Sequence, residues 1–244
     1  MAFEKLLNNI ARTLISSQIK PQICRLPLLQ NQFVKSQFSR FYSSDKNNSG
    51  KKPNHRENKS FRHNYSEEVE AAVNHQILSE LNASMVYLSM FCYYGRTDIA
   101  LPGCQSYFKA MYHEEQDHAL EFVQYQLMRG GQVRLFPITV PEDGNWTDIT
   151  IALGVALGLE KRVKEQLEDL AELAECHNDK QLVDLLDSKF MKEQNESICE
   201  LSRLLTKAKR LVDTGGVGRH IFDKEIFKYV AKKHPHIKLP FDTI

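Results

Sequence analysis

The stretch FKAMYHEEQDHALEF, residues 108–122, places a carboxylate and an imidazole on the apolar face of a predicted helix. Glu115 follows Met111 by four residues and His118 precedes Phe122 by four, so both share the stripe formed by these apolar side chains. Burying a lone carboxylate costs several kcal/mol, so such a group is neutralised, paired or bound to a metal. The spacing therefore predicts a metal site inside a helical protein.

Three other segments repeat this pattern of one polar residue within an apolar helical stripe. Glu80 interrupts the stripe of residues 73–91, Glu160 that of residues 152–174, and Gln194 that of residues 182–204. Taken singly, each glutamate also fits a boundary position whose carboxylate reaches water. Four such residues, one from each segment, favour a common site in the core of a helical bundle.

Capping residues and breakers predict helices over 66–94, 102–129, 147–176, 180–211 and 219–232. Short turns make the first two helices antiparallel, and likewise the third and fourth. The connector 130–145, with a strand-like segment at 133–136, is long enough to run the length of the bundle and make the second and third helices parallel. The fold class predicted is all-α: a four-helix bundle with one long crossover connection and a short fifth C-terminal helix.

Composition separates a basic leader from the bundle. The chain has 244 residues, 42% hydrophobic and 26% charged, with a net charge of +1, which argues against nucleic acid as a partner. No apolar run is long enough to span a membrane. Five scattered cysteines without a Cys-x-x-Cys motif predict reduced, mostly buried thiols.

Residues 1–42 are amphipathic and poor in acids, which is typical of a mitochondrial transit peptide directing the chain to the matrix. A disordered basic tail on a cytosolic protein and a chloroplast leader are the alternatives. Cleavage is expected after Tyr42, within Arg40-Phe41-Tyr42-Ser43. We expect a disordered linker at 43–63, the bundle with its fifth helix at 64–232, and a C-terminal tail at 233–244.

The ligand types indicate a hard, oxygen-rich site suited to iron. Glu80 and His118 complete the shell of one metal with Glu115, which bridges to a second metal held by Glu160. Where related diiron enzymes carry a second Glu-x-x-His, this chain has Gln194 and Ser197, so the second metal is held more weakly. Tyr87 lies on the face of Glu80, either to hydrogen-bond a ligand carboxylate or as an ordinary core tyrosine.

Several runs together resemble ferritins of the heavy-chain type. They are ILSELNAS (77–84), YLSM (87–90), HEEQDHA (113–119), RGG (129–131), ALGLEK (156–161) and EQ (193–194). With its leader, the chain resembles a mitochondrial member of this family.

The resemblance implies a ferroxidase that oxidises ferrous iron with dioxygen at a diiron centre and stores it as ferric oxyhydroxide inside a homo-oligomeric shell of 24 subunits. It implies that Glu80, Glu115, His118, Glu160 and Gln194 form the centre. Glu114 is a nearby accessory carboxylate and Tyr87 supports the ligands. Asp184 and Asp187 match the acidic lining of the three-fold channel through which iron enters, although by themselves they would be a solvated face. Phe190 replaces a tyrosine usual in vertebrate heavy chains, and Leu120 replaces one of the carboxylates linked to mineral nucleation.

Two other function classes would require different residues at the centre. A catalytically silent structural subunit would lack the equivalents of Glu80, Glu115 or His118, all of which are present here. A diiron oxygenase acting on an organic substrate would carry a second Glu-x-x-His in the fourth helix, where Ser197 stands. The ligand set therefore favours a ferroxidase.

Overall fold

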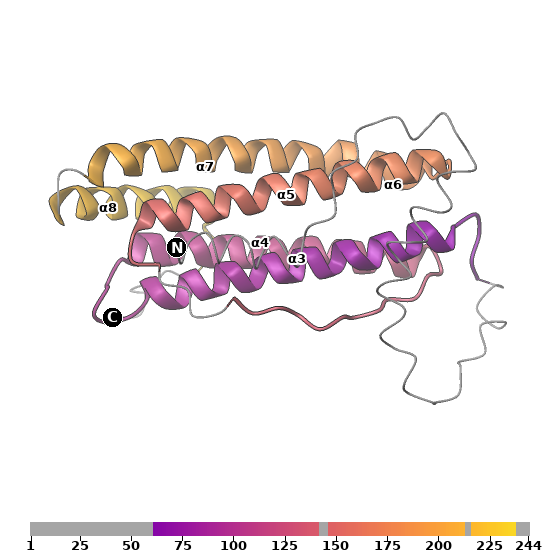
Figure 1. Cartoon of the computed structure of the whole chain (residues 1–244), viewed down its shortest axis with the longest axis horizontal. Coiled ribbons are helices and arrows are strands. Elements are labelled where there is room, and N and C mark those ends of the chain that lie inside the picture. The colour runs from indigo at the N-terminus through magenta and orange to yellow at the C-terminus, as the bar shows by residue number, and fades with distance from the viewer. Residues whose placement is uncertain (1–60, 142–145, 213–215, 238–244) are drawn as a thin grey trace, which may run out of the picture. The chain divides into compact units, whose positions relative to one another are not determined.

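The computed structural model describes residues 61–141, 146–212 and 216–237. These residues contain helices and no strand, which confirms the predicted all-α class (Figure 1). The elements in chain order are α3 (Glu67–Tyr94), α4 (Pro102–Met128), α5 (Ile149–Cys176), α6 (Lys180–Leu185), the π-helical turn η3 (Leu186–Phe190), α7 (Met191–Val212) and α8 (Gly216–Lys233).

Local signals set the helix ends where the sequence placed them. The Ser66 side chain accepts a hydrogen bond from Val69 N at 3.0 Å and caps α3. Pro102 occupies the first turn of α4, where its missing N–H costs nothing. After α4, Gly130 adopts a φ of +71°, and a Cβ there would lie 2.6 Å from Phe61 O. Only glycine fits this stop.

Cross-helix contacts give the predicted directions. Along α3, Ser79 bonds Gln166 and Tyr87 bonds Glu160, so α5 runs antiparallel to α3. The hydrogen bond from Tyr65, which precedes α3, to Gln126 near the end of α4 likewise makes α4 antiparallel to α3. Because both are antiparallel to α3, α4 and α5 are parallel to each other, as the long connector requires.

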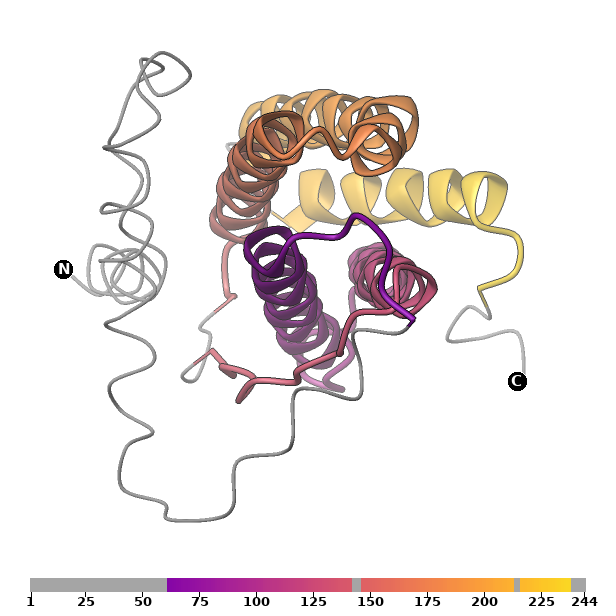
Figure 2. The ribbon, with the colours of Figure 1, turned by 90° about the vertical axis from the view of Figure 1, so that its right-hand side faces the viewer.

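The described part of the connector, residues 130–141, lies along α3, and Trp146 after it contacts the same helix. The side-chain amide of Asn74 donates a hydrogen bond to Gln132 O and accepts one from Arg134 N. Further along α3, Asn82 accepts a hydrogen bond from Thr139 N. Ser89 accepts one from Trp146 Nε1 at 3.0 Å. Figures 1 and 2 show this segment lying along α3. The strand-like segment 133–136 is not a strand, because side chains of α3, rather than a neighbouring strand, bond this stretch of backbone.

The fourth helix runs without a break from Lys180 to Val212, as expected for 180–211, but it is not α-helical throughout. The π-helical turn η3 separates α6 from α7, adding a residue to the turn and shifting the faces on either side of it. Periodicity alone missed the π-helical turn because apolar residues continue through it.

Helix α8 begins at Gly216 rather than at 219, so two glycines expected to break the chain lie inside it. Gly216 is the exposed first residue of α8, whereas Gly218 is buried on a helix that lies against α4, so packing offsets the poor helix propensity of Gly218. Asp223 accepts a hydrogen bond from Cys104 N at 2.8 Å, and a Cβ on Gly103 would lie 1.9 Å from Asp223 O. Figure 2 shows α8 crossing the direction of the long helices.

A polar network ties one end of the bundle together. Asp179, at the start of α6, accepts hydrogen bonds from Tyr125 at 3.1 Å and from Arg129 at 2.7 Å, while Tyr65 bonds Gln126. We call Tyr65, Tyr125, Gln126, Arg129 and Asp179 the end clamp. It joins the beginning of α3, the end of α4 and the beginning of the fourth helix.

Several predictions fall at the margins of the described ranges. The predicted leader 1–42, the linker up to residue 60 and the tail from 238 lie outside them. Arg62, which falls in the expected linker, bonds Tyr65 O and pairs with Glu70 at the start of the bundle. Among the described cysteines only Cys104 is buried, so the expectation of mostly buried thiols is wrong here; the exposed ones are Cys92, Cys176 and Cys199. Within these ranges no helix combines the length and apolar character needed to cross a membrane.

Candidate metal centre

Three of the predicted ligands meet in the middle of the bundle. Glu80 comes from α3, and Glu115 and His118 come from successive turns of α4. One ligand atom from each residue lies within 4.8 Å of the others. The residues are 0%, 2% and 8% exposed, respectively. The structure thus brings together side chains that the sequence separates by up to 38 positions.

The oxygens that face this centre are incompletely hydrogen-bonded. Gln76, one turn before Glu80, donates to Glu80 Oε1 at 2.7 Å. Glu80 Oε2 and Glu115 Oε2 are buried and have no hydrogen-bond partner. A buried polar oxygen without a partner is costly, so native proteins keep such groups mainly where a ligand or ion completes them. The arrangement fits a cation.

The electrostatics favour the same conclusion. Burial, followed by repulsion from Glu115, raises the pKa of Glu80 well above its usual value. Burial and the nearby Glu160 raise the pKa of Glu115 to about 7. Burial lowers the pKa of His118, but the contacts with Glu115 and Glu193 outweigh it and raise the pKa to about 11. Mutual repulsion among buried carboxylates is relieved when a divalent cation binds between them.

Glu160 and Gln194 form an adjoining pair across α5 and the fourth helix. Gln194 Nε2 donates to the Glu160 carboxylate and, at 2.8 Å, to its backbone oxygen. The Tyr87 hydroxyl donates to the other carboxylate oxygen of Glu160. Burial raises the pKa of Glu160, whereas these two hydrogen bonds lower it. The sequence left two interpretations of Tyr87, a hydrogen bond to a carboxylate of the centre or an ordinary core tyrosine. The structure shows the hydrogen bond to a carboxylate.

His118 has a second acidic neighbour, Glu193, which the sequence analysis quoted only within the run EQ (193–194) and to which it gave no role. Its Nδ1 lies 3.6 Å from Glu115 Oε2, and its Nε2 lies 3.3 Å from Glu193 Oε2. The ring of Phe190 packs edge-on against the imidazole, with centroids 5.4 Å apart. Glu193 is half-buried, and the apolar pattern of its helix does not identify it as a partner of His118. Gln76 lies four residues before Glu80, and this spacing, which is visible in the sequence, predicts its contact with the Glu80 carboxylate.

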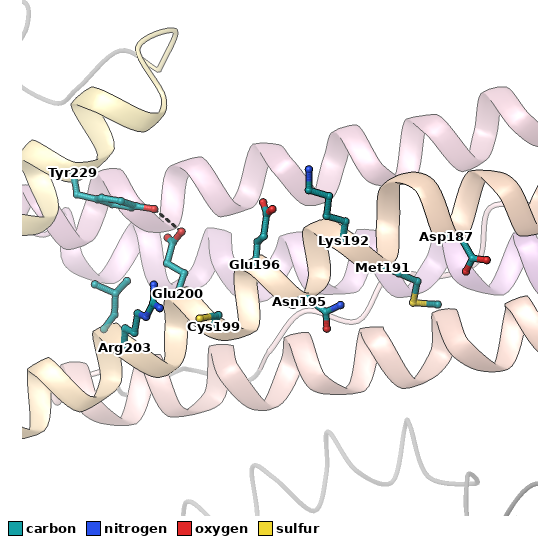
Figure 3. Close-up of a pocket in the computed structure, with 10 residues that line it drawn as sticks. Asp187, Met191, Lys192, Asn195, Glu196, Cys199, Glu200, Arg203 and Tyr229 are labelled. Atoms are coloured by element: carbon teal, nitrogen blue, oxygen red, sulfur yellow. Dashed lines mark hydrogen bonds between the residues drawn. The ribbon is translucent and has the colours of Figure 1, made fainter.

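Of the remaining predicted residues, Glu114 lies beside the cluster, near enough to His118 and Glu160 to interact with them electrostatically, and the two aspartates lie on the surface. Glu114 is partly exposed, its Oε2 lacks a partner, and burial raises its pKa. Asp184 and Asp187 are exposed on α6 and η3. Asp187 lies at one end of an open groove of about 780 Å³ along α7, which Tyr229 of α8 borders at the other end, bonded to Glu200 (Figure 3).

Comparison with known proteins identifies the family. The model of the ferritin-like domain matches residues 70–211. This chain belongs to the ferritin family. It is 45% identical over 164 residues to soma ferritin of Lymnaea stagnalis, covering 67% of this chain and 93% of that protein. It is 40% identical over 168 residues to the ferritin middle subunit of Aquarana catesbeiana, covering 68% and 96%.

Relatives from other lineages give similar values. The chain is 41% identical over 165 residues to a ferritin of Pacifastacus leniusculus, covering 68% of this chain and 90% of the relative. It is 44% identical over 158 residues to chloroplastic ferritin-3 of Vigna unguiculata, covering 63% and 61%. Ferritins store iron, and the carboxylate and imidazole cluster in the bundle offers the donor atoms that iron prefers.

Proposed function

We propose that this chain is a ferroxidase subunit of the heavy-chain type that oxidises ferrous iron with dioxygen at a diiron centre. The observation that carries the proposal is the mid-bundle cluster of Glu80, Glu115 and His118, in which each glutamate keeps one buried oxygen without a hydrogen-bond partner. A chain that only built the shell would have no reason to keep unsatisfied carboxylates at its core.

Each residue has a role in this mechanism. Glu80, Glu115 and His118 hold one ferrous ion, and Glu115 bridges to a second ion held by Glu160, with Gln194 beside it. Tyr87 fixes the Glu160 carboxylate through its hydrogen bond. Dioxygen would take one electron from each of the two ferrous ions and so be reduced to the peroxide level, and the negative charge of the carboxylates would stabilise the two ferric ions formed.

Iron enters and leaves by acidic surfaces. In this proposal Asp184 and Asp187 line a channel at a three-fold axis of a homo-oligomeric 24-subunit shell, and Glu114 serves as an accessory carboxylate beside the centre. The ferric product is stored inside as oxyhydroxide mineral. Exposure of both aspartates supports the channel assignment.

In the same proposal, residues 1–42 direct the chain to the mitochondrial matrix and are removed there.

Iron oxidation by the full chain tests the proposal. The metal-free protein receives Fe(II) in air while ferric absorbance and oxygen consumption are followed. Glu115→Ala is expected to slow oxidation by about 100-fold or more, because the shared ligand of both ions is lost. Glu168→Ala, on the exposed face of α5, is the matched control and should behave as wild type.

Oligomer size is checked for all three proteins, so that loss of assembly is not mistaken for loss of the centre. A wild-type rate no faster than buffer would overturn the proposal. The chain would then be a catalytically silent subunit that supports shell assembly and mineral nucleation.

A further inference from the structure

The imidazole of His118 lies between two carboxylates from different helices. Glu115, on the same helix, faces Nδ1 at 3.6 Å, whereas Glu193, on α7, faces Nε2 at 3.3 Å. The two ring nitrogens point in different directions, and only the first faces a member of the proposed metal cluster. Nδ1 of the ring therefore faces the proposed metal cluster, and Nε2 faces a carboxylate outside it.

Glu193 is suited to hold the second nitrogen. Its Oε2 is buried and lacks a hydrogen bond of full geometry, and the imidazole Nε2 is the group that faces it. The carboxylate oxygen can act as an acceptor, and it faces Nε2 across 3.3 Å from a different helix. A small rotation of the imidazole would complete a charge-assisted hydrogen bond.

The fourth helix also restrains the plane of the ring. Phe190, the last residue of η3, packs edge-on against His118 and stacks on Phe122 with centroids 4.4 Å apart. Just before it, Lys189 pairs with Glu121 of α4, fixing η3 to that helix. Glu193 follows Phe190 by three residues, so one turn of the fourth helix supplies both the packing and the acceptor.

We propose that Glu193 is a positioning residue for His118, accepting the Nε2 proton so that Nδ1 presents its lone pair toward Glu80 and Glu115. Metal-binding histidines commonly donate their other ring N–H to a carboxylate, which fixes the tautomer and the ring orientation. The inference rests on the proposed metal role of His118, but it concerns binding and does not require that iron be oxidised.

A double-mutant cycle on the metal-free full chain tests it, with Co²⁺ alone as the probe and its visible absorption as the readout. Glu193→Ala is expected to weaken Co²⁺ binding by about 10- to 100-fold. Glu193→Gln, which keeps an acceptor oxygen, should lose less. Glu196→Ala, an exposed position on the same helix, is the control and should leave binding unchanged.

In the His118→Ala background, Glu80 and Glu115 still bind Co²⁺ weakly, and Glu193→Ala should have no further effect. An equal loss in both backgrounds would overturn the proposal, because Glu193 would then act on the metal directly. No loss in either background would overturn it as well. Should His118→Ala fail to assemble, His118→Gln provides the same comparison.

The cycle also separates this inference from the proposed function. Coupling between Glu193 and His118 in Co²⁺ binding, together with wild-type iron oxidation no faster than buffer, would support the positioning role and reject the ferroxidase. Rapid iron oxidation by wild type, without coupling between Glu193 and His118 in Co²⁺ binding, would support the ferroxidase and reject the positioning role.

Discussion

Two groups of buried polar side chains lie in this bundle, and they differ in how their hydrogen-bonding capacity is used. In the end clamp, Asp179 accepts from Tyr125, Arg129 and Leu182 N, so its carboxylate is well supplied with donors. In the metal centre, Glu80 and Glu115 each keep one buried oxygen without a partner. The carboxylates of both groups, Asp179, Glu80 and Glu115, are nearly inaccessible to water.

The difference teaches that burial alone does not say what a polar residue does. A carboxylate with its donors in place joins helices, and removing it leaves a charge uncompensated. A carboxylate that lacks donors destabilises the metal-free fold and is kept for what binds there.

Asp179→Ala should lower the free energy of unfolding by about 3 to 5 kcal/mol, because Arg129 then lies at the bundle end without its counter-charge. Guanidinium denaturation at fixed protein concentration measures this. Asp98→Ala, which removes the same kind of partner from the exposed Arg96 pair, should leave the midpoint unchanged. Equal effects at the two sites would remove the distinction between them.

Zn²⁺, which is redox-inert, should stabilise the metal-free protein by about 2.7 kcal/mol when added at a hundred times its dissociation constant. The gain comes from completing the oxygens of Glu80 and Glu115, so it should disappear in Glu115→Leu. It should persist in Asp179→Ala despite that variant's lower stability. Thermal unfolding with and without Zn²⁺ gives the answer, and a gain retained by Glu115→Leu would place the metal elsewhere.

Glu115→Leu should raise the stability of the metal-free chain by about 1 to 2 kcal/mol, since an apolar side chain of similar size replaces a carboxyl with an unpartnered oxygen. The sign is opposite to that expected in the end clamp. Denaturation of both metal-free proteins under identical conditions measures it. A clear loss of stability would mean that Glu115 serves the fold.

Tyr87→Phe should cost about 1 kcal/mol of stability and slow iron oxidation by about fivefold, because Glu160 loses one of the donors that orient it. Tyr94→Phe is the matched control. It removes a buried hydrogen bond to Trp146 O at 2.8 Å, away from the cluster, and should lose similar stability with no change in rate. If the two variants oxidise iron at equal rates, Tyr87 is an ordinary core tyrosine with no role in the centre.

Much of the fold could be predicted because it depends on local chemistry. Ser66, Pro102 and Gly130 mark helix ends through a side-chain cap, a missing N–H and a positive φ, all properties of single residues. The π-helical turn could not be predicted, since its apolar pattern is that of an α-helix and the choice depends on packing against α4. The strand-like connector failed for a related reason: its hydrogen bonds go to side chains of α3.

The sequence by itself determined which polar residues of the centre are buried. A repeat of 3.6 residues places Glu80, Glu115, His118, Glu160 and Gln194 on apolar stripes, whatever the helices later pack against. Only the tertiary structure decided which of their atoms meet and which lack partners. The approach of Glu193 to His118 and the bonds of Tyr87 and Gln194 to Glu160 join different helices. Their distances depend on how whole helices pack, and no spacing along one chain segment encodes that.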